Sequence, residues 1–175
     1  MKKVLAIIFL FIAHTACKKS TPSSTNTPPP FSCTTDACTL TYYKWGIASE
    51  TITTDMGTYT YTAAQLADEN WATFTFQHDS TCLTHGGGTD TYSFDPSSKK
   101  LILTENLLPI PFDVAFPAKT SMTLTGVKVA MHPRTDSSIV ATYAINSIAG
   151  GLHNDFNVDT SKIHFIQTVF AYNGY

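Results

Sequence analysis

The densest group of potential metal ligands in this chain is the run His78-x3-Cys82-x2-His85, with Asp79 and Asp90 nearby in the sequence. A thiolate and two imidazoles can bind zinc and leave one position open for water, as in a metal-dependent hydrolase. No fourth ligand stands at a suitable spacing, and a loop thiol tends to oxidise in an exported protein. We therefore expect two loop histidines beside a structural cysteine, and no metal site.

The tetrapeptide His85-Gly86-Gly87-Gly88 resembles the oxyanion-hole motif of lipases and esterases. That motif acts only beside a Gly-x-Ser-x-Gly nucleophile elbow, which the sequence lacks. Glycines between two β-type segments are better explained by a hairpin loop that needs positive φ angles. We predict a hairpin loop here.

The glutamates Glu50, Glu69 and Glu105 each stand alone in the sequence. Their spacing does not assign a carboxylate pair for glycoside hydrolysis. No serine or cysteine stands in a recognisable nucleophile context either. The sequence therefore predicts a non-catalytic protein, with no catalytic residues and no cofactor.

Aromatic residues that alternate with small polar ones are the remaining chemical signal. Inward-facing aromatic side chains of a small β-barrel either fill the interior or line a cavity for one small ligand. The residues that we expect to contact such a ligand are Trp45, Tyr59, Tyr61, Phe74, Phe76 and Phe112.

Alternation with a period of two dominates the chain from Phe31 onward and predicts short β-strands. The expected strands cover residues 40–47, 58–61, 72–78, 91–95, 100–104, 122–131, 138–145 and 163–172. Thr62 and Gln65 match a capping box, so residues 63–69 form the one helix that we expect. Residues 146–160, which include two adjacent glycines, are expected to form a long connection.

Residues 105–119 combine many apolar side chains with Pro109, Pro111 and Pro117. Prolines at these spacings disfavour both a helix and a central strand. We expect an irregular apolar crossover that covers a sheet edge or a barrel mouth, and we favour residues 107–116 as a lid over the mouth.

About eight short strands with frequent turn signals predict an all-β domain, either an antiparallel up-and-down barrel or a β-sandwich. Trp45 near the first strand, and the meander over residues 72–104, resemble the lipocalin-like domains of lipoproteins from the Bacteroidetes. This resemblance covers residues 40–105 and implies a barrel that binds a small ligand.

The composition is that of a secreted β protein. Only 14% of the residues are charged and the formal net charge is −2. No basic block follows Lys18-Lys19, so we expect no binding to nucleic acid.

Four cysteines are present, and Cys17, Cys33, Cys38 and Cys82 have different expected roles. An exported chain meets an oxidising compartment, where disulfides form. We favour a Cys33–Cys38 disulfide, which closes a small loop, over a link to Cys82. Three cysteines besides Cys17 leave one thiol that is free or pairs between chains.

The N-terminus has the pattern of an export signal. Lys2 and Lys3 precede an apolar run over residues 4–13 that is too short to cross a hydrocarbon core of about 30 Å. Small residues directly before Cys17 resemble the lipobox of bacterial lipoproteins. In that family the cysteine is lipidated and becomes the new N-terminus, which implies a signal peptide over residues 1–16.

Residues 17–30 then comprise the lipidated Cys17 and a tether rich in Ser, Thr and Pro. The all-β domain is expected over residues 31–175. Lys18-Lys19 match neither the retention signal nor the acidic export tags of lipoproteins. The resemblance therefore implies an anchor in the outer membrane, with the domain on the periplasmic side.

These observations predict an envelope lipoprotein that binds a small apolar or amphipathic ligand in a β-barrel. The alternative is a structural or interaction lipoprotein with a filled core that engages an envelope protein. A third hypothesis is the metal-dependent hydrolase with His78, Cys82 and His85.

Overall fold

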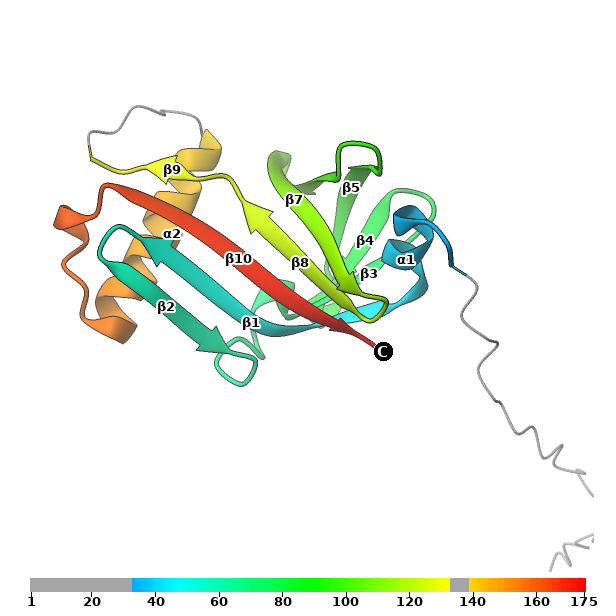
Figure 1. Ribbon diagram of the computed structural model, residues 1–175, viewed down its shortest axis with the longest axis horizontal. Helices are drawn as coiled ribbons and strands as arrows, with labels where there is room; N and C mark the ends of the chain where they lie inside the picture. The colour runs from blue at the N-terminus through cyan, green and yellow to red at the C-terminus, as the bar shows by residue number, and fades with distance from the viewer. Residues whose placement is uncertain (1–32, 133–138) are drawn as a thin grey trace, which may run out of the picture. The chain divides into compact units, whose positions relative to one another are not determined.

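A computed structural model of the protein describes residues 33–132 and 139–175 (Figure 1). The predicted signal peptide (1–16), Cys17 and the tether (17–30) lie outside the described residues. The strands are β1 (Lys44–Thr54), β2 (Gly57–Thr62), β3 (Thr73–Phe76), β4 (Thr81–Thr84), β5 (Thr89–Asp95), β6 (Lys100–Glu105), β7 (Leu108–Ala118), β8 (Ser121–Gly126), β9 (Val129–Ala130) and β10 (Phe165–Gly174). The helices are α1 (Asp36–Tyr42) and α2 (Ile139–Phe156), with 3₁₀ turns η1 (Asn70–Ala72), η2 (His85–Gly87) and η3 (Thr160–Lys162).

Eight antiparallel strands form a closed barrel in the order β1-β3-β4-β5-β6-β7-β8-β10, with β10 pairing back onto β1. From β3 to β8 the strands follow one another as an up-and-down meander. This confirms the predicted all-β antiparallel barrel and decides against the sandwich alternative. The loop between β4 and β5 holds Gly86 and Gly87 at φ angles of 75° and 87°, as predicted for a hairpin loop.

Strands β1 and β10, which pair with each other, extend beyond the barrel. The N-terminal end of β1 pairs with β3, and its C-terminal half pairs with β2. The C-terminal half of β10 likewise pairs with β8, and its N-terminal end pairs with β9. The result is a four-stranded extension, β2-β1-β10-β9, against which α2 packs (Figure 1).

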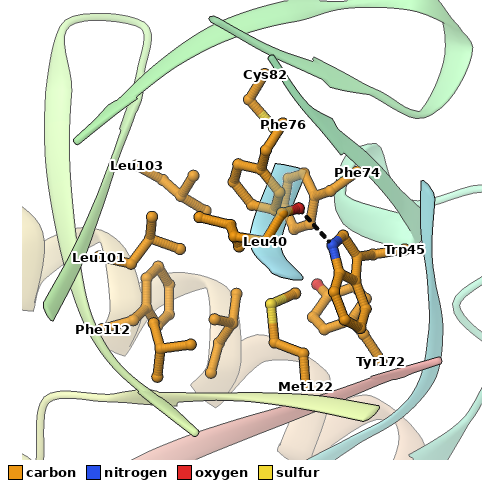
Figure 2. Close-up of a cluster of buried hydrophobic side chains, with 12 residues drawn as sticks. Leu40, Trp45, Phe74, Phe76, Cys82, Leu101, Leu103, Phe112, Met122 and Tyr172 are labelled. Atoms are coloured by element: carbon orange, nitrogen blue, oxygen red, sulfur yellow. Dashed lines mark hydrogen bonds between the residues drawn. The ribbon is translucent and has the colours of Figure 1, made fainter. Parts of the chain in front are cut away.

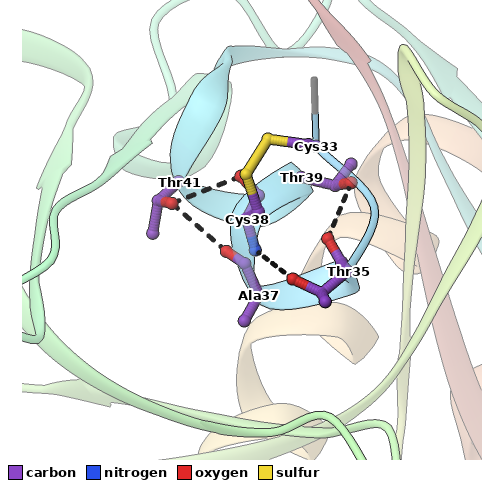
Figure 3. Close-up of a disulfide and its surroundings, with 6 residues drawn as sticks. All are labelled: Cys33, Thr35, Ala37, Cys38, Thr39 and Thr41. Carbon is purple, nitrogen blue, oxygen red and sulfur yellow. Dashed lines mark hydrogen bonds between the residues drawn. A yellow bond between two sulfur atoms is a disulfide. The ribbon is translucent and has the colours of Figure 1, made fainter. Parts of the chain in front are cut away.

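Helix α1 precedes the first strand, where the sequence pattern predicted a strand over residues 40–47. Thr35 caps the helix by accepting a hydrogen bond from the Cys38 N–H at 3.3 Å (Figure 3). Cys33 and Cys38, the pair favoured from the sequence, are joined in a disulfide across this cap. The cap and the disulfide hold residues 36–42 as a helix, so the strand begins only at Lys44.

The interior of the barrel beside α1 is packed with large apolar side chains (Figure 2). Leu40 of α1 reaches into this interior, and its carbonyl oxygen accepts a hydrogen bond from Trp45 Nε1 at 2.9 Å. Trp45, Phe74 and Met122 are fully buried. Helix α1 therefore closes one end of the barrel, and we call this end the closed end.

The proline-containing segment is a barrel strand, so the predicted irregular crossover over residues 105–119 is wrong. Pro109 and Pro111 pair with β6, whereas pairing with β8 begins only at Phe112. N–H groups two residues apart point to the same edge, so these prolines omit donors on the side that lacks a neighbour. Pro117 lies at the irregularity between residues 115 and 118. Strand β7 is thus a wall of the barrel and not a lid.

Helix α2 covers residues 139–156, so the predicted strand over residues 138–145 is wrong for its described part, and most of the predicted connection over residues 146–160 is helical. Ile148, Leu152 and Phe156 recur at intervals of four residues, which places them on one face of a helix. That face packs on Ile52 and Ile166 of the extension. The gain from burying this face outweighs the low helix propensity of the β-branched residues and glycines.

The predicted helix over residues 63–69 is a series of turns. The capping contacts are present, because Gln65 Oε1 accepts hydrogen bonds from the N–H and the hydroxyl of Thr62, both at 2.9 Å. Beyond the first turn, where the Leu66 N–H donates to the Thr62 carbonyl at 3.3 Å, the Glu69 N–H donates to the carbonyl of Leu66, three residues earlier, so the chain forms separate turns. No helix in the described part of the chain has the length and apolar character needed to cross a membrane.

Candidate functional site

The three residues considered for metal binding do not form a site. Cys82 is fully buried in the barrel core, whereas His78 and His85 are exposed in the loops on either side of β4. Side chains alternate along a strand, so the cysteine points inward and its neighbour Leu83 points outward. Burial raises the pKa of the Cys82 thiol to about 12. Among residues 33–132 and 139–175, no group of three or more His, Cys, Asp or Glu is placed to hold a metal ion.

The barrel is open at the end away from α1, and a cavity of about 580 Å³ lies there, between the barrel and α2. Its volume falls in the range of pockets that hold small molecules. Strands β1 and β10 supply Ile47, Ile52 and Ile166, and α2 supplies Ile148 and Gly151. We call this space the mouth cavity.

Glu50 faces the mouth cavity because β1 contains a bulge. The pairing with β10 shifts register between Ile47 and Ser49, so one extra residue is inserted at Ala48. Without this insertion, strict alternation from Trp45 would turn Glu50 outward. With it, Glu50 lies on the same face as Ile47 and Ile52, and all three line the cavity.

Three further acidic side chains line the mouth cavity: Glu69, Glu105 and Asp155. Glu105 accepts a hydrogen bond from Asn70 Nδ2 at 3.1 Å, and Asp155 accepts one from Tyr61 Oη at 2.8 Å. The three come from the loop after β2, the end of β6 and helix α2, so only the tertiary structure brings them to one cavity.

The carboxyl group of Glu50 titrates close to neutral pH. Its pKa is raised from 4.5 to about 7, first by burial and second by repulsion from Glu69. No described residue donates a hydrogen bond to this carboxyl group or forms an ion pair with it. This carboxyl group can therefore hold a proton, exchange one with a bound molecule, or pair with a cation.

Two buried polar atoms on residues of the cavity wall have no hydrogen-bond partner among the described residues. They are Trp71 Nε1 and Thr168 Oγ1. Thr168 is 6% exposed and lies on the inward face of β10, between Ile166 and Phe170. Buried polar groups are usually satisfied, so such atoms mark a place where a partner is missing.

Aromatic rings form one side of the cavity. Trp71, Phe112 and Phe170 contact one another edge-to-face, with ring centroids 5.7 to 6.1 Å apart. Their apolar surfaces, together with the ring of Tyr61, give the cavity an aromatic lining in addition to its carboxylates.

The structure separates the six residues that the sequence suggested for ligand contact. Tyr61 and Phe112 line the mouth cavity. Tyr59 packs on Phe156 under α2. The other three, Trp45, Phe74 and Phe76, fill the closed end.

Sequence reasoning missed Glu50, Trp71, Thr168 and Phe170. The inward orientation of Glu50 was not predictable, because it depends on the bulge and alternation alone assigns Glu50 to the outer face. Thr168 and Phe170 belong to the predicted strand over residues 163–172, whose apolar character on both faces did not indicate which face is inside. Trp71 lies in a 3₁₀ turn, which has no period to detect.

Comparisons of the chain with protein-family models, with curated proteins and with solved structures found no match. The mouth cavity is therefore interpreted from its own geometry and chemistry.

Proposed function

We propose that this domain binds a small amphipathic ligand in the mouth cavity. The observation that carries the proposal is the cavity itself, with aliphatic and aromatic walls and a few convergent polar groups. That combination is typical of small-molecule sites, in which apolar area supplies affinity and polar groups supply orientation. The proposed role is binding and not catalysis.

The binding takes place at the cell envelope in this proposal. The lipobox-like residues before Cys17 and the Pro-rich tether over residues 17–30 support a lipid-anchored domain on the periplasmic face of the outer membrane. A tethered binding domain can capture a molecule near the membrane without leaving it.

The alternative is an interaction lipoprotein that engages an envelope protein. That function needs a filled interior and an exposed apolar patch or strand edge. The closed end is filled, but the mouth cavity leaves the interior incomplete. The cavity therefore supports the ligand-binding proposal over this alternative.

The test uses the mature chain, residues 17–175, carrying Cys17→Ser and exported behind another signal peptide so that no lipid or detergent competes for the cavity. Native and denaturing mass spectra would be recorded side by side. We expect either a co-purified small molecule that is lost on denaturation or an empty protein that binds 1-decanol in calorimetric titration.

A matched pair of variants locates the binding. Val127 lines the cavity and is 55% exposed, whereas Met56 is 47% exposed and is not on the cavity wall. Val127→Trp should weaken 1-decanol binding by about tenfold or more through steric exclusion, and Met56→Trp should leave it unchanged. A protein with no co-purified molecule and no affinity for 1-decanol or for its charged analogues of equal chain length, decylamine and decanoate, would refute the proposal.

A further inference from the structure

We propose that the ligand is an amphipathic organic cation, an amine with an apolar chain, whose charged head pairs with Glu50 at the wall of the mouth cavity. This inference rests on the proposed binding function and names the chemical class of the ligand.

The charge of the cavity wall is the first argument. Four carboxylates line it, and none of its described lining residues is Lys, Arg or His. Several lysines are engaged elsewhere: Lys99 pairs with Asp36, Lys100 with Asp113, and Lys162 with Asp159. The described residues thus leave the acidic groups of the cavity without a basic partner.

The position of Glu50 is the second argument. The bulge in β1 turns its side chain inward, next to the apolar Ile47 and Ile52. An ionised carboxylate in such surroundings loses hydration and is also repelled by Glu69. A bound ammonium group would offset both effects, because it neutralises the charge and donates hydrogen bonds.

The remaining wall suits the rest of such a molecule. Tyr61, Trp71, Phe112 and Phe170 offer apolar surface to an alkyl chain, and aromatic faces also attract an ammonium group. Thr168, whose buried hydroxyl lacks a partner among the described residues, also lines the cavity and supplies a potential hydrogen-bond acceptor. An anionic head would meet four like charges in the same space and would be excluded.

The experiment compares three probes of equal chain length: decylamine, 1-decanol and decanoate. Each is titrated calorimetrically below its micellar concentration into the mature chain with Cys17→Ser at about pH 8, where an alkylamine with a lysine-like pKa of about 10.4 is charged. We expect decylamine to bind at least about tenfold more tightly than 1-decanol, and decanoate to bind most weakly.

Two variants assign the preference to Glu50. Glu50→Gln should remove most of the preference for decylamine over 1-decanol, because it takes away the carboxylate nearest to the apolar wall residues Ile47 and Ile52. Circular dichroism and a cooperative urea transition show that the variant is folded. Asp68→Asn removes the same charge from an exposed residue that does not line the cavity, and should preserve the preference. This control separates pairing inside the cavity from general attraction to an acidic protein.

The outcomes distinguish the two proposals. Equal binding of decylamine and 1-decanol overturns the cation inference and leaves the binding function standing. An amine preference that Glu50→Gln leaves undiminished overturns the pairing of the charged head with Glu50, and with it this inference. Binding of none of the three probes, in a protein without a co-purified molecule, overturns both.

Discussion

The closed end and the mouth of the barrel are built from the same strands, but their buried polar groups differ in whether they are hydrogen-bonded. At the closed end, Trp45 donates its indole N–H to the carbonyl of Leu40, and Tyr172 donates to the carbonyl of Trp71 at 3.1 Å. At the mouth, the indole N–H of Trp71 and the hydroxyl of Thr168 have no partner among the described residues.

This difference follows from the paths of β1 and β10. At one end these strands belong to the barrel and carry Trp45 and Tyr172 into a packed core. At the other end they leave the barrel, pair with β2 and β9, and face α2 across a cavity. The comparison teaches that a packed core and an open cavity are separated along the same two strands.

The largest expected effect concerns packing at the two ends. Phe74→Ala in the closed end should lower the free energy of unfolding by about 3–5 kcal/mol, because it opens a void in a filled core. Phe170→Ala should cost about half as much, because that ring is only partly buried and already borders a cavity. Urea denaturation followed by circular dichroism measures both, and equal losses would contradict the distinction between the two ends.

The next effect is the pH dependence caused by Glu50. The pKa of its carboxyl group is 4.5 in the reference state and about 7 in the folded protein, so the folded state binds the proton more tightly. The resulting stabilisation is complete below about pH 4.5 and is lost as the pH rises to about 7.

Glu50→Gln should therefore raise the free energy of unfolding at about pH 8 by on the order of 3 kcal/mol, with no gain below about pH 4. Urea denaturation across this pH range checks the prediction, with Asp68→Asn as the control. A gain that does not depend on pH would show that burial does not penalise the ionised form of Glu50.

Two threonines of equal burial test the unpartnered hydroxyl. Thr84 and Thr168 are each 6% exposed, but Thr84 Oγ1 donates to Asn70 Oδ1 at 2.9 Å, whereas Thr168 Oγ1 has no described partner. Replacement by valine should stabilise the protein by about 1–2 kcal/mol at Thr168 and destabilise it by about 1 kcal/mol at Thr84. Thermal and urea unfolding of the two variants would show opposite signs, and a loss at Thr168 would reveal a hidden partner.

The smallest expected effect is a difference in stability between alanine variants of two adjacent glycines in α2, and it tests how closely α2 packs on Tyr61 of β2. A Cβ atom at Gly151 would lie 2.8 Å from Tyr61 Oη, whereas one at Gly150 would meet nothing within 4 Å. Gly150→Ala should stabilise the protein by up to about 1 kcal/mol through helix propensity. Gly151→Ala should lose that gain, because the new methyl group displaces Tyr61 from Asp155. The difference in urea midpoint between the variants is the measurement, and equal midpoints would place α2 farther from β2.

Short strands were predictable wherever one face of a strand is buried. Alternation identified β2, β3, β5 and β6, and the glycine run identified the loop after β4. Alternation failed for α2, whose β-branched residues favour strands locally and become helical because one face packs on the extension. It also failed for β7, because a sequence does not reveal which edge of a strand lacks a neighbour.

The sequence by itself indicated an antiparallel all-β domain, with a barrel or a sandwich as its architecture, and favoured the Cys33–Cys38 pair, because these depend on alternation and on short separations along the chain. The structure decided for the barrel and contains that disulfide. Only the tertiary structure decided which aromatic residues fill the closed end and which line the mouth. It also brought Glu50, Glu69, Glu105 and Asp155 to one cavity. The physical reason is that a single inserted residue in β1 reverses which side chains face inward, and the position of α2 depends on contacts far apart in the chain.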